Sequence, residues 1–248
     1  ARFQRLQGKS VLFVTGSDEH GQKIQRTAES LRRSPQAHCD LIVEGFKSLW
    51  DKLNIRYDRF IRTTDDRHAA IVEEFFQRVW ESGDIYLSQQ QGWYCVACEE
   101  FKEERELLDE HHCAIHPNKQ AEWRDEENYF FRLSNYQQKL EQLYQDRPNF
   151  ILPSTRRNEV LNFVGQGLRD FSISRRNLDW GFPVPVDPKQ TLYVWFDALL
   201  GYITALLDPD VEPTLDNALS NWWPIDIHLI GKDILRFHAV YGPAMLMS

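Results

Sequence analysis

The chain has 248 residues, of which 42% are hydrophobic and 13% aromatic, which is enough for one large globular domain or two smaller ones. A mean hydropathy of −0.54 and the lack of apolar runs near the roughly 20 residues of a membrane-spanning helix argue against an integral membrane protein, and we expect no signal peptide. The formal net charge of −8 excludes a surface that binds nucleic acid throughout, so any such contact would be local.

A ligand-binding turn is predicted directly after the apolar stretch of residues 10–15. The stretch ends at Gly16, presents Asp18 and passes through Gly21 into a polar segment of helical composition. Open α/β sheets bind ligands where a parallel strand gives way to a helix in this manner. A carboxylate is costly to bury there unless it meets a cation or hydrogen-bond donors. The ammonium group of a ligand is one candidate partner for Asp18, and capping of the following helix is the alternative.

The next segments alternate between helices and strands, which favours a parallel sheet and the α/β fold class. Ser34 is a predicted N-cap because Pro35 follows it at the first helical position. The pattern predicts helices over residues 22–31, 34–53 and 64–82, and extended segments over residues 55–63 and 85–87.

Residues 95–116 carry a spacing that is typical of a metal site. A Cys-x-x-Cys pair and a Cys-x-x-His pair are separated by fourteen residues. Three thiolates and one imidazole make a closed tetrahedral site for a structural Zn²⁺, with no open position for catalysis. The predicted ligands are Cys95, Cys98, Cys113 and His116. Two unrelated cysteine pairs with a chance histidine are the alternative.

The remaining histidines and cysteine of this part of the sequence are assigned by position. His111 and His112 compete as ligands, but the Cys-x-x-His spacing favours His116. Cys39 lies on the long predicted helix and is expected to pack against other side chains. Cysteines that ligate a metal instead of forming disulfides indicate a reducing compartment, so we expect a cytoplasmic protein.

A small inserted α+β domain that carries the zinc is predicted over residues 88–178. The composition predicts strands over residues 129–133 and 170–174, and helices over residues 134–148 and 159–168. Residues 1–87 and 179–248 are then expected to form the two halves of the domain that contains the parallel sheet.

A second strand-to-turn junction is predicted where the apolar strand of residues 225–230 ends in Gly231-Lys232-Asp233. This turn has the same Gly-x-Asp pattern as the turn at Asp18, and a helix follows it. If both strands belong to one sheet, Asp18 and Asp233 face one crevice, where one would hold an ammonium group and the other ribose hydroxyls. Backbone N–H groups near Gly231 could take an anion. Since no catalytic triad or phosphate-binding loop stands out, we interpret the crevice as a clamp that positions its substrate.

Residues 192–202 are predicted to begin extended and to become helical near Asp197. Trp195, Ala198 and Tyr202 then fall on one face of the helix. Packing in the core is the ordinary interpretation of such a stripe.

Six stretches of the sequence resemble one family, and they occur in that family's order over nearly the whole chain. They are FVTGSDEHG, IRTTD, the Cys-x-x-Cys and Cys-x-x-His pairs, SRRNLDWGFPVP, LYVWFDALLGYI and HLIGKDILRFHAVYGPAM. Together they resemble the methionyl-tRNA synthetases, which are class I aminoacyl-tRNA synthetases, in the bacterial form with a single zinc knuckle. The resemblance implies a Rossmann-type catalytic domain that is split by a zinc-bearing connective peptide domain.

The resemblance also implies a reaction and its partners. Methionine would be activated by ATP with Mg²⁺ to methionyl-adenylate and then transferred to tRNA(Met), with no DNA or membrane partner. Asp18 would bind the methionine α-ammonium group, while Gly231 and Asp233 would contact the adenosine ribose. Arg175 is a secondary candidate for handling phosphate or carboxylate charge. The side-chain pocket would be lined by Trp195, Ala198, Tyr202, Ile234 and His238, with Tyr202 and His238 near the thioether sulfur.

Two departures from the family pattern qualify this expectation. The HIGH motif is expected before residue 1 and the KMSKS loop after residue 248, so we expect the segment alone to have little or no adenylation activity. Gly242 stands where the family usually has a bulky aromatic residue, which could loosen the methionine site.

Two rival functions remain at this point. A sibling class I synthetase for leucine, isoleucine, valine or cysteine would share the chemistry, although Trp195, Tyr202 and His238 argue against it. A non-catalytic, zinc-bearing module that binds tRNA or another partner would lack the chemistry altogether. Titration with methionine and competing amino acids distinguishes these hypotheses.

Overall fold

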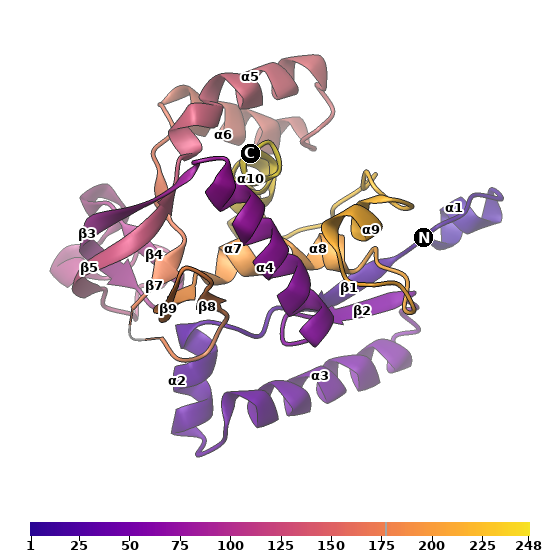
Figure 1. Ribbon diagram of the computed structural model, residues 1–248, viewed down its shortest axis with the longest axis horizontal. Coiled ribbons are helices and arrows are strands. Elements are labelled where there is room, and N and C mark those ends of the chain that lie inside the picture. The colour runs from indigo at the N-terminus through magenta and orange to yellow at the C-terminus, as the bar shows by residue number, and fades with distance from the viewer. Residues whose placement is uncertain (177) are drawn as a thin grey trace.

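The computed structural model describes residues 1–176 and 178–248, and it shows an α/β fold (Figure 1). Strands β1 (Val14–Ser17) and β2 (Arg59–Arg62) pair in parallel, with Val14 opposite Arg59. The helices of this first part are α1 (Arg2–Leu6), α2 (Gln22–Ser30), α3 (Pro35–Lys52) and α4 (Asp66–Glu81). Figure 1 shows α3 running along one side of the β1–β2 pair. The parallel arrangement that the alternating pattern predicted is therefore confirmed.

Helix α3 begins as its sequence predicts. The Ser34 hydroxyl accepts a hydrogen bond from the Ala37 N–H at 3.2 Å, and Pro35 occupies the first helical position. Leu41, Phe46 and Leu49 on this helix are exposed, so its broad apolar face is only partly covered by the described residues.

An antiparallel sheet carries the middle of the chain. Its strands are β3 (Ile85–Cys95), β4 (Glu100–Lys102), β5 (Glu122–Phe131) and β6 (Phe171–Ser172), in the order β4-β3-β5-β6. Strand β3 is much longer than the predicted segment 85–87, because it pairs with β5 from Ile85 opposite Phe131 to Tyr94 opposite Glu122. The segment between β3 and β5 carries the Cys/His residues: Cys95 and Cys98 come before the short 3-10 turns η1 (Glu104–Glu106) and η2 (Asp109–His111), and Cys113 and His116 come after them.

The segment that follows contains a 3-10 turn η3 (Leu133–Tyr136) and helices α5 (Gln137–Asp146) and α6 (Ser154–Gly165). Helix α6 begins after Pro153, five residues before the predicted start at residue 159. The predicted strand 170–174 is divided in two at Ile173. Its first part is β6, whereas β7 (Ser174–Arg175) joins β8 (Pro183–Val184) and β9 (Asp187–Leu192) in a separate antiparallel sheet of order β7-β9-β8.

The last part of the described chain is mostly helical. Its elements are α7 (Val194–Ala198), α8 (Gly201–Thr204), α9 (Leu215–Leu219), the 3-10 turn η4 (Lys232–Ile234), the π-helical turn η5 (Phe237–Tyr241) and α10 (Gly242–Leu246). The predicted strand over residues 225–230 is wrong. This segment pairs with no strand of the described chain, and Ile227 and Leu229 are 71% and 89% exposed. An apolar alternation becomes a strand only where a neighbouring strand satisfies its backbone groups.

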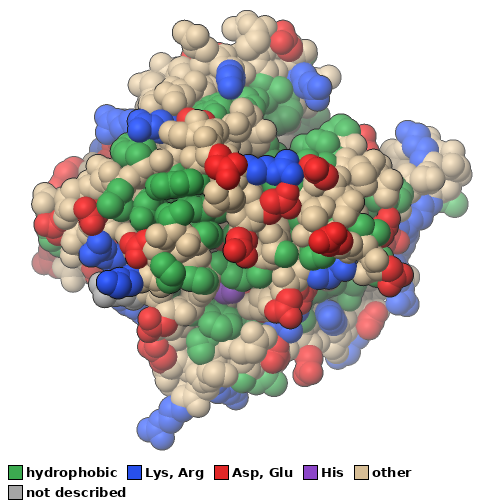
Figure 2. Space-filling view, in the orientation of Figure 1, with side chains coloured by type: hydrophobic (Ala, Val, Ile, Leu, Met, Phe, Trp, Pro, Cys, Tyr) green, Lys and Arg blue, Asp and Glu red, His purple; other side chains and the backbone are tan. Residues whose placement is uncertain are grey.

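One hydrophobic core connects elements from α4 to the end of the described chain. It includes Phe76 of α4, Phe131 of β5, Leu140 of α5, Phe196 of α7 and Met245 of α10, all essentially inaccessible to solvent. The face drawn in Figure 2 carries acidic and basic side chains interspersed with apolar ones. None of the helices in the described part of the chain has the length and apolar character needed to cross a membrane.

Candidate active site and metal centre

A cavity of about 280 Å³ lies at the carboxyl end of β1, between the β1–β2 pair, α7, α8 and the segment around η4 and η5. It brings together all six residues that were predicted to bind the amino acid. These are Asp18, Trp195, Ala198, Tyr202, Ile234 and His238. With Ile61 and Thr63, which also line it, four separate segments of the sequence converge on one small-molecule-sized hollow.

Asp18 supplies the carboxyl group of this cavity. The residue lines the cavity and keeps an exposed surface, while nearby protein atoms partly remove water from its carboxyl group. This burial raises the pKa of Asp18 well above its usual range, and the negative charges of Asp197 and Glu99 add to the shift. A carboxyl group in such an environment gains from a cationic partner, because the cation favours the charged form that the surroundings disfavour.

The aromatic wall of the cavity is uncharged. Trp195 stacks on Phe237 with ring centroids 4.0 Å apart and planes 7° from parallel. Nδ1–H of His238 donates to the Ile234 carbonyl at 2.9 Å, which leaves Nε2 to accept from the Tyr202 hydroxyl at 2.7 Å. Burial lowers the pKa of His238, which favours the neutral ring. The wall thus suits an apolar or thioether side chain.

The turn that presents Asp18 is anchored by its neighbour Glu19, which the sequence analysis did not identify. Arg62 of β2 donates two hydrogen bonds to the buried Glu19 carboxylate, at 2.7 and 2.8 Å. Burial works against this charge, but hydrogen bonds from Arg62, Ser17 and Thr64 hold the pKa of Glu19 below its usual range. The bidentate pair fixes the end of β1 against β2.

A second group that sequence reasoning missed lies behind the cavity. Nδ1–H of His20 donates to one oxygen of Asp197 at 2.6 Å, and Nε2–H of His68 donates to the other at 2.7 Å. Nδ1 of His68 in turn lies 2.8 Å from the Thr204 hydroxyl. Burial opposes ionisation of Asp197, yet the two imidazoles hold its pKa below the usual range. This buried network joins the turn after β1 to α4, α7 and α8.

The residues predicted to contact ATP lie outside the set that lines the cavity. Asp233 is exposed in η4, one residue before the cavity-lining Ile234, and Gly231 precedes the same turn. Because residues 225–230 do not form a strand, the two Gly-x-Asp turns are not matched strand ends as predicted.

Arg175 is placed in the interior and not at the cavity. Its guanidinium donates to the Ser172 hydroxyl and the Ser174 carbonyl, both at 2.7 Å, and lies 4.2 Å from the centre of the Tyr193 ring. It lines a different hollow of about 530 Å³, between β4, α6 and η5. These contacts make packing and hydrogen bonding the visible role of this side chain.

Gly242 begins α10 close to the cavity wall. A Cβ atom added there would lie 3.7 Å from a methyl carbon of Leu199, which lines the cavity, and 3.2 Å from the Phe237 carbonyl oxygen. A side chain at residue 242 would therefore touch Leu199 at an ordinary contact distance and would crowd the Phe237 carbonyl oxygen.

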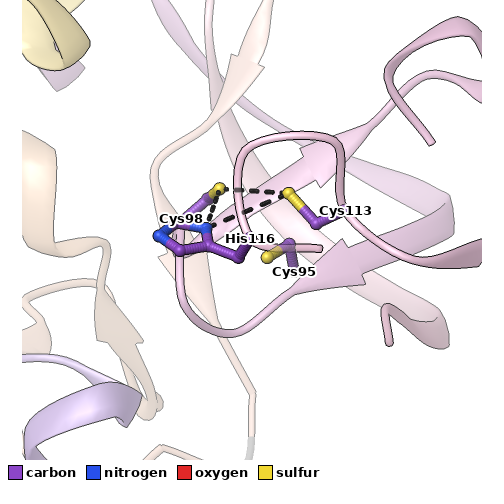
Figure 3. Close-up of side chains that lie close together, drawn as sticks. All are labelled: Cys95, Cys98, Cys113 and His116. Carbon is purple, nitrogen blue, oxygen red and sulfur yellow. Dashed lines mark hydrogen bonds between the residues drawn. The ribbon is translucent and has the colours of Figure 1, made fainter. Parts of the chain in front are cut away.

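The predicted metal ligands form one cluster, which Figure 3 shows with their donor atoms turned toward one another. Cys95 ends β3 and Cys98 follows in the next turn, while Cys113 and His116 come from the loop after η2. All four donor atoms lie within 4.8 Å of one another. Sγ of Cys98 lies 3.5 Å from Sγ of Cys113 and 3.2 Å from Nδ1 of His116. Ligands about 2.0 to 2.3 Å from a tetrahedral Zn²⁺ have similar separations, so these residues fit such an ion.

The competing histidines point elsewhere. His111 stacks on Trp93 with ring centroids 3.7 Å apart, and Nδ1 of His112 lies 3.0 Å from the Asp109 carbonyl oxygen. Cys39 is buried on α3 with Sγ 3.7 Å from the Glu19 carbonyl oxygen, and burial raises the pKa of this thiol to about 11. Among the described residues, Cys39 belongs to no metal-binding group, in agreement with a packing role.

Comparison with known proteins assigns the chain to a family. Residues 1–115 and 102–248 match the family described as tRNA synthetases class I (M). The chain belongs to this family. A methionine–tRNA ligase of Synechocystis sp. is 74% identical to it over 248 residues, which are all of this chain and 47% of that protein. The chloroplastic/mitochondrial methionine–tRNA ligase of Arabidopsis thaliana is 57% identical over the whole chain, which covers 40% of that protein.

The fold also agrees with that of a solved structure. The Mycobacterium tuberculosis methionyl-tRNA synthetase bound by methionyl-adenylate matches with a TM-score of 0.92 and 45% identity, over all of this chain and 49% of that chain. The chain thus spans about half the length of the curated relatives it matches. The predicted family and the predicted α/β fold class are both confirmed.

Proposed function

We propose that this chain forms the amino-acid-binding part of a methionine–tRNA ligase, which activates methionine with ATP and transfers it to tRNA(Met). The observation that carries the proposal is the single cavity that is lined by Asp18, Trp195, Tyr202 and His238. The relatives are named for the same reaction, and one similar structure is described as bound by methionyl-adenylate.

The charge of the cavity supports recognition of an amino acid by its ammonium group. Asp18 is the carboxyl group of the cavity, and the nearby charges of Asp197 and Glu99, which contribute to its raised pKa, favour a bound cation. A charge-assisted hydrogen bond between Asp18 and the α-ammonium group would orient the substrate.

The opposite wall supports selection of a thioether side chain. The stacked Trp195–Phe237 pair and the neutral Tyr202–His238 pair present polarizable, uncharged surfaces. Sulfur–aromatic contacts stabilise by about 0.3 to 1.5 kcal/mol each, so selectivity has to come from several contacts and from shape.

The proposal also covers the contacts to ATP, the metal in the Cys/His site and the division of the chain into parts. Asp233 and Gly231, beside the cavity-lining Ile234, would contact the ribose of ATP, which would enter with Mg²⁺. The donor set of three thiolates and one imidazole favours Zn²⁺, held in a closed structural site. We also propose the three-part division at residues 1–87, 88–178 and 179–248, and a cytoplasmic location.

Calorimetric titration with methionine tests the proposal. The parent chain is expected to bind methionine in preference to leucine, isoleucine, valine and cysteine. Asp18→Ala is expected to weaken binding about 10- to 100-fold, since a hydrogen bond to a charged group contributes about 1.5 to 3 kcal/mol.

The matched control is Glu29→Ala, which removes an exposed carboxylate from α2 outside the cavity and should leave the affinity unchanged. Tighter binding of one of the competing amino acids would assign the chain to a sibling synthetase. No heat with any of them at millimolar concentration would contradict the proposal and favour a non-catalytic binding module.

A further inference from the structure

The metal-binding loop contacts the turn that presents Asp18 through one side chain, Glu99. This residue directly follows the predicted ligand Cys98, and only 8% of its surface is exposed. Its carboxylate accepts a hydrogen bond from the backbone N–H of Lys23 at 2.7 Å, across 76 residues of sequence. Lys23 is the second residue of α2.

Glu99 takes the place of a cap that α2 lacks. The N-cap position of α2 is Gly21, which has no side chain to accept from the first N–H groups of the helix. A carboxylate that accepts from the second helical N–H acts as a capping side chain, and its negative charge also suits the positive end of the helix dipole. The start of α2 is therefore stabilised by a residue of the metal loop.

The two segments are so close that a side chain at residue 21 would have to displace the carboxylate of Glu99. A Cβ atom on Gly21 would lie 2.3 and 2.5 Å from the two carboxylate oxygens of Glu99. Gly21 has a φ of +101°, and its N–H donates to the Trp180 carbonyl at 3.1 Å. The turn from Asp18 to Gly21 is thus enclosed between Glu99 and Trp180.

We infer that Glu99 is a positioning residue that couples order in the metal loop to the position of Asp18. Only two residues, Glu19 and His20, separate Gly21 at the N-cap position of α2 from Asp18, which lines the cavity. Glu99 itself adopts a left-handed backbone conformation, with a φ of 55°. A metal ion held by the neighbouring Cys98 would maintain this conformation, because metal binding orders the loop that supplies its ligands. For the identity of the bound amino acid, the inference rests on the proposed function.

Two substitutions and one control test this role. Glu99→Ala removes the cap, Glu99→Gln keeps the side-chain oxygen and the shape, and Glu104→Ala removes an exposed carboxylate from the same segment. Zinc content, hydrogen exchange of the α2 amides and methionine affinity are measured for each variant. The Glu99→Ala variant should still bind one zinc per chain. Compared with the parent, its Lys23 amide should exchange about tenfold faster, and its methionine affinity should be about five- to tenfold weaker. The exchange rate and the methionine affinity of Glu99→Gln should lie between those of the parent and Glu99→Ala, and those of Glu104→Ala should match the parent.

Removal of zinc by a chelator provides the second arm. In the parent, it should accelerate exchange at the start of α2 and weaken methionine binding, whereas in Glu99→Ala it should add much less to either effect. Equal effects of chelation in both proteins, or unchanged α2 exchange in Glu99→Ala, would overturn the inference. If the parent binds no methionine, the proposed function fails, while the exchange measurements still decide the role of Glu99.

Discussion

Asp18 combines a solvent-facing position with surroundings that oppose its charge. Among the described residues that line the cavity, it alone carries a carboxyl group, and Asp197 and Glu99 repel its ionised form. The negative charges that disfavour ionisation of Asp18 also favour a cation bound beside it. From the raised pKa of Asp18 we also predict how this residue affects the stability of the ligand-free chain.

Asp18→Asn is expected to raise the melting temperature slightly at neutral pH while it weakens methionine binding. The pKa of Asp18 in the folded chain is raised above its usual value, so the folded state binds more protons than the unfolded state between the two pKa values. Stability conferred by protonated Asp18 is therefore lost as the pH rises through this window. Because the cavity admits water, the effect is smaller than for a fully enclosed carboxyl group.

Thermal unfolding of the parent and Asp18→Asn, measured from pH 3 to pH 8, checks this sign. The advantage of the variant should disappear at low pH, where Asp18 is protonated in both states. A variant that is less stable than the parent at neutral pH would contradict the account.

The elements around the cavity are joined by the buried Asp197 network. Asp197 of α7 accepts from His20 in the turn after β1 and from His68 of α4, so three elements meet on one carboxylate. Such a network fixes the distance between the wall that carries Trp195 and the turn that carries Asp18.

Asp197→Asn should lower the free energy of unfolding by about 3 kcal/mol, because one amide N–H₂ would face an imidazole N–H inside the core. Denaturant unfolding measures this loss. Asp216→Asn is the matched control, since the Asp216 carboxylate is 82% exposed in its pair with Arg78 and should contribute at most about 1 kcal/mol. Equal stability of Asp197→Asn and the parent would show that the network does not hold these elements together.

At the scale of elements, local signals predicted some features and not others. The Ser34-Pro35 start of α3 depends on neighbouring residues only, and it was predicted correctly. The length of β3 depends on its pairing with β5, and the failure of residues 225–230 to form a strand depends on the absence of a described strand beside them. Whether a partner strand lies beside a segment cannot be read from the residues of that segment alone.

At the scale of the whole molecule, the cavity is built from residues near both ends of the chain, and the metal loop comes from its middle. Family motifs predicted six positions for the amino-acid pocket, and the Cys/His spacing predicted four metal ligands; the structure brings each set into one cluster. The contact between the clusters escaped prediction, because Glu99 and Lys23 have no periodic or motif relationship across 76 residues. Arg175, the secondary candidate for phosphate or carboxylate charge, lies outside the cavity, with hydrogen bonds to Ser172 and Ser174.

The central claim is that Asp18 recognises the α-ammonium group of methionine in this cavity. The most direct test is a calorimetric comparison of methionine with its desamino analogue, 4-(methylthio)butanoate, on the parent chain and on Asp18→Asn. The parent should prefer methionine by about 10- to 100-fold, the contribution expected of a charged hydrogen bond, and Asp18→Asn should lose this preference. Equal affinity of the parent for both compounds would contradict the account.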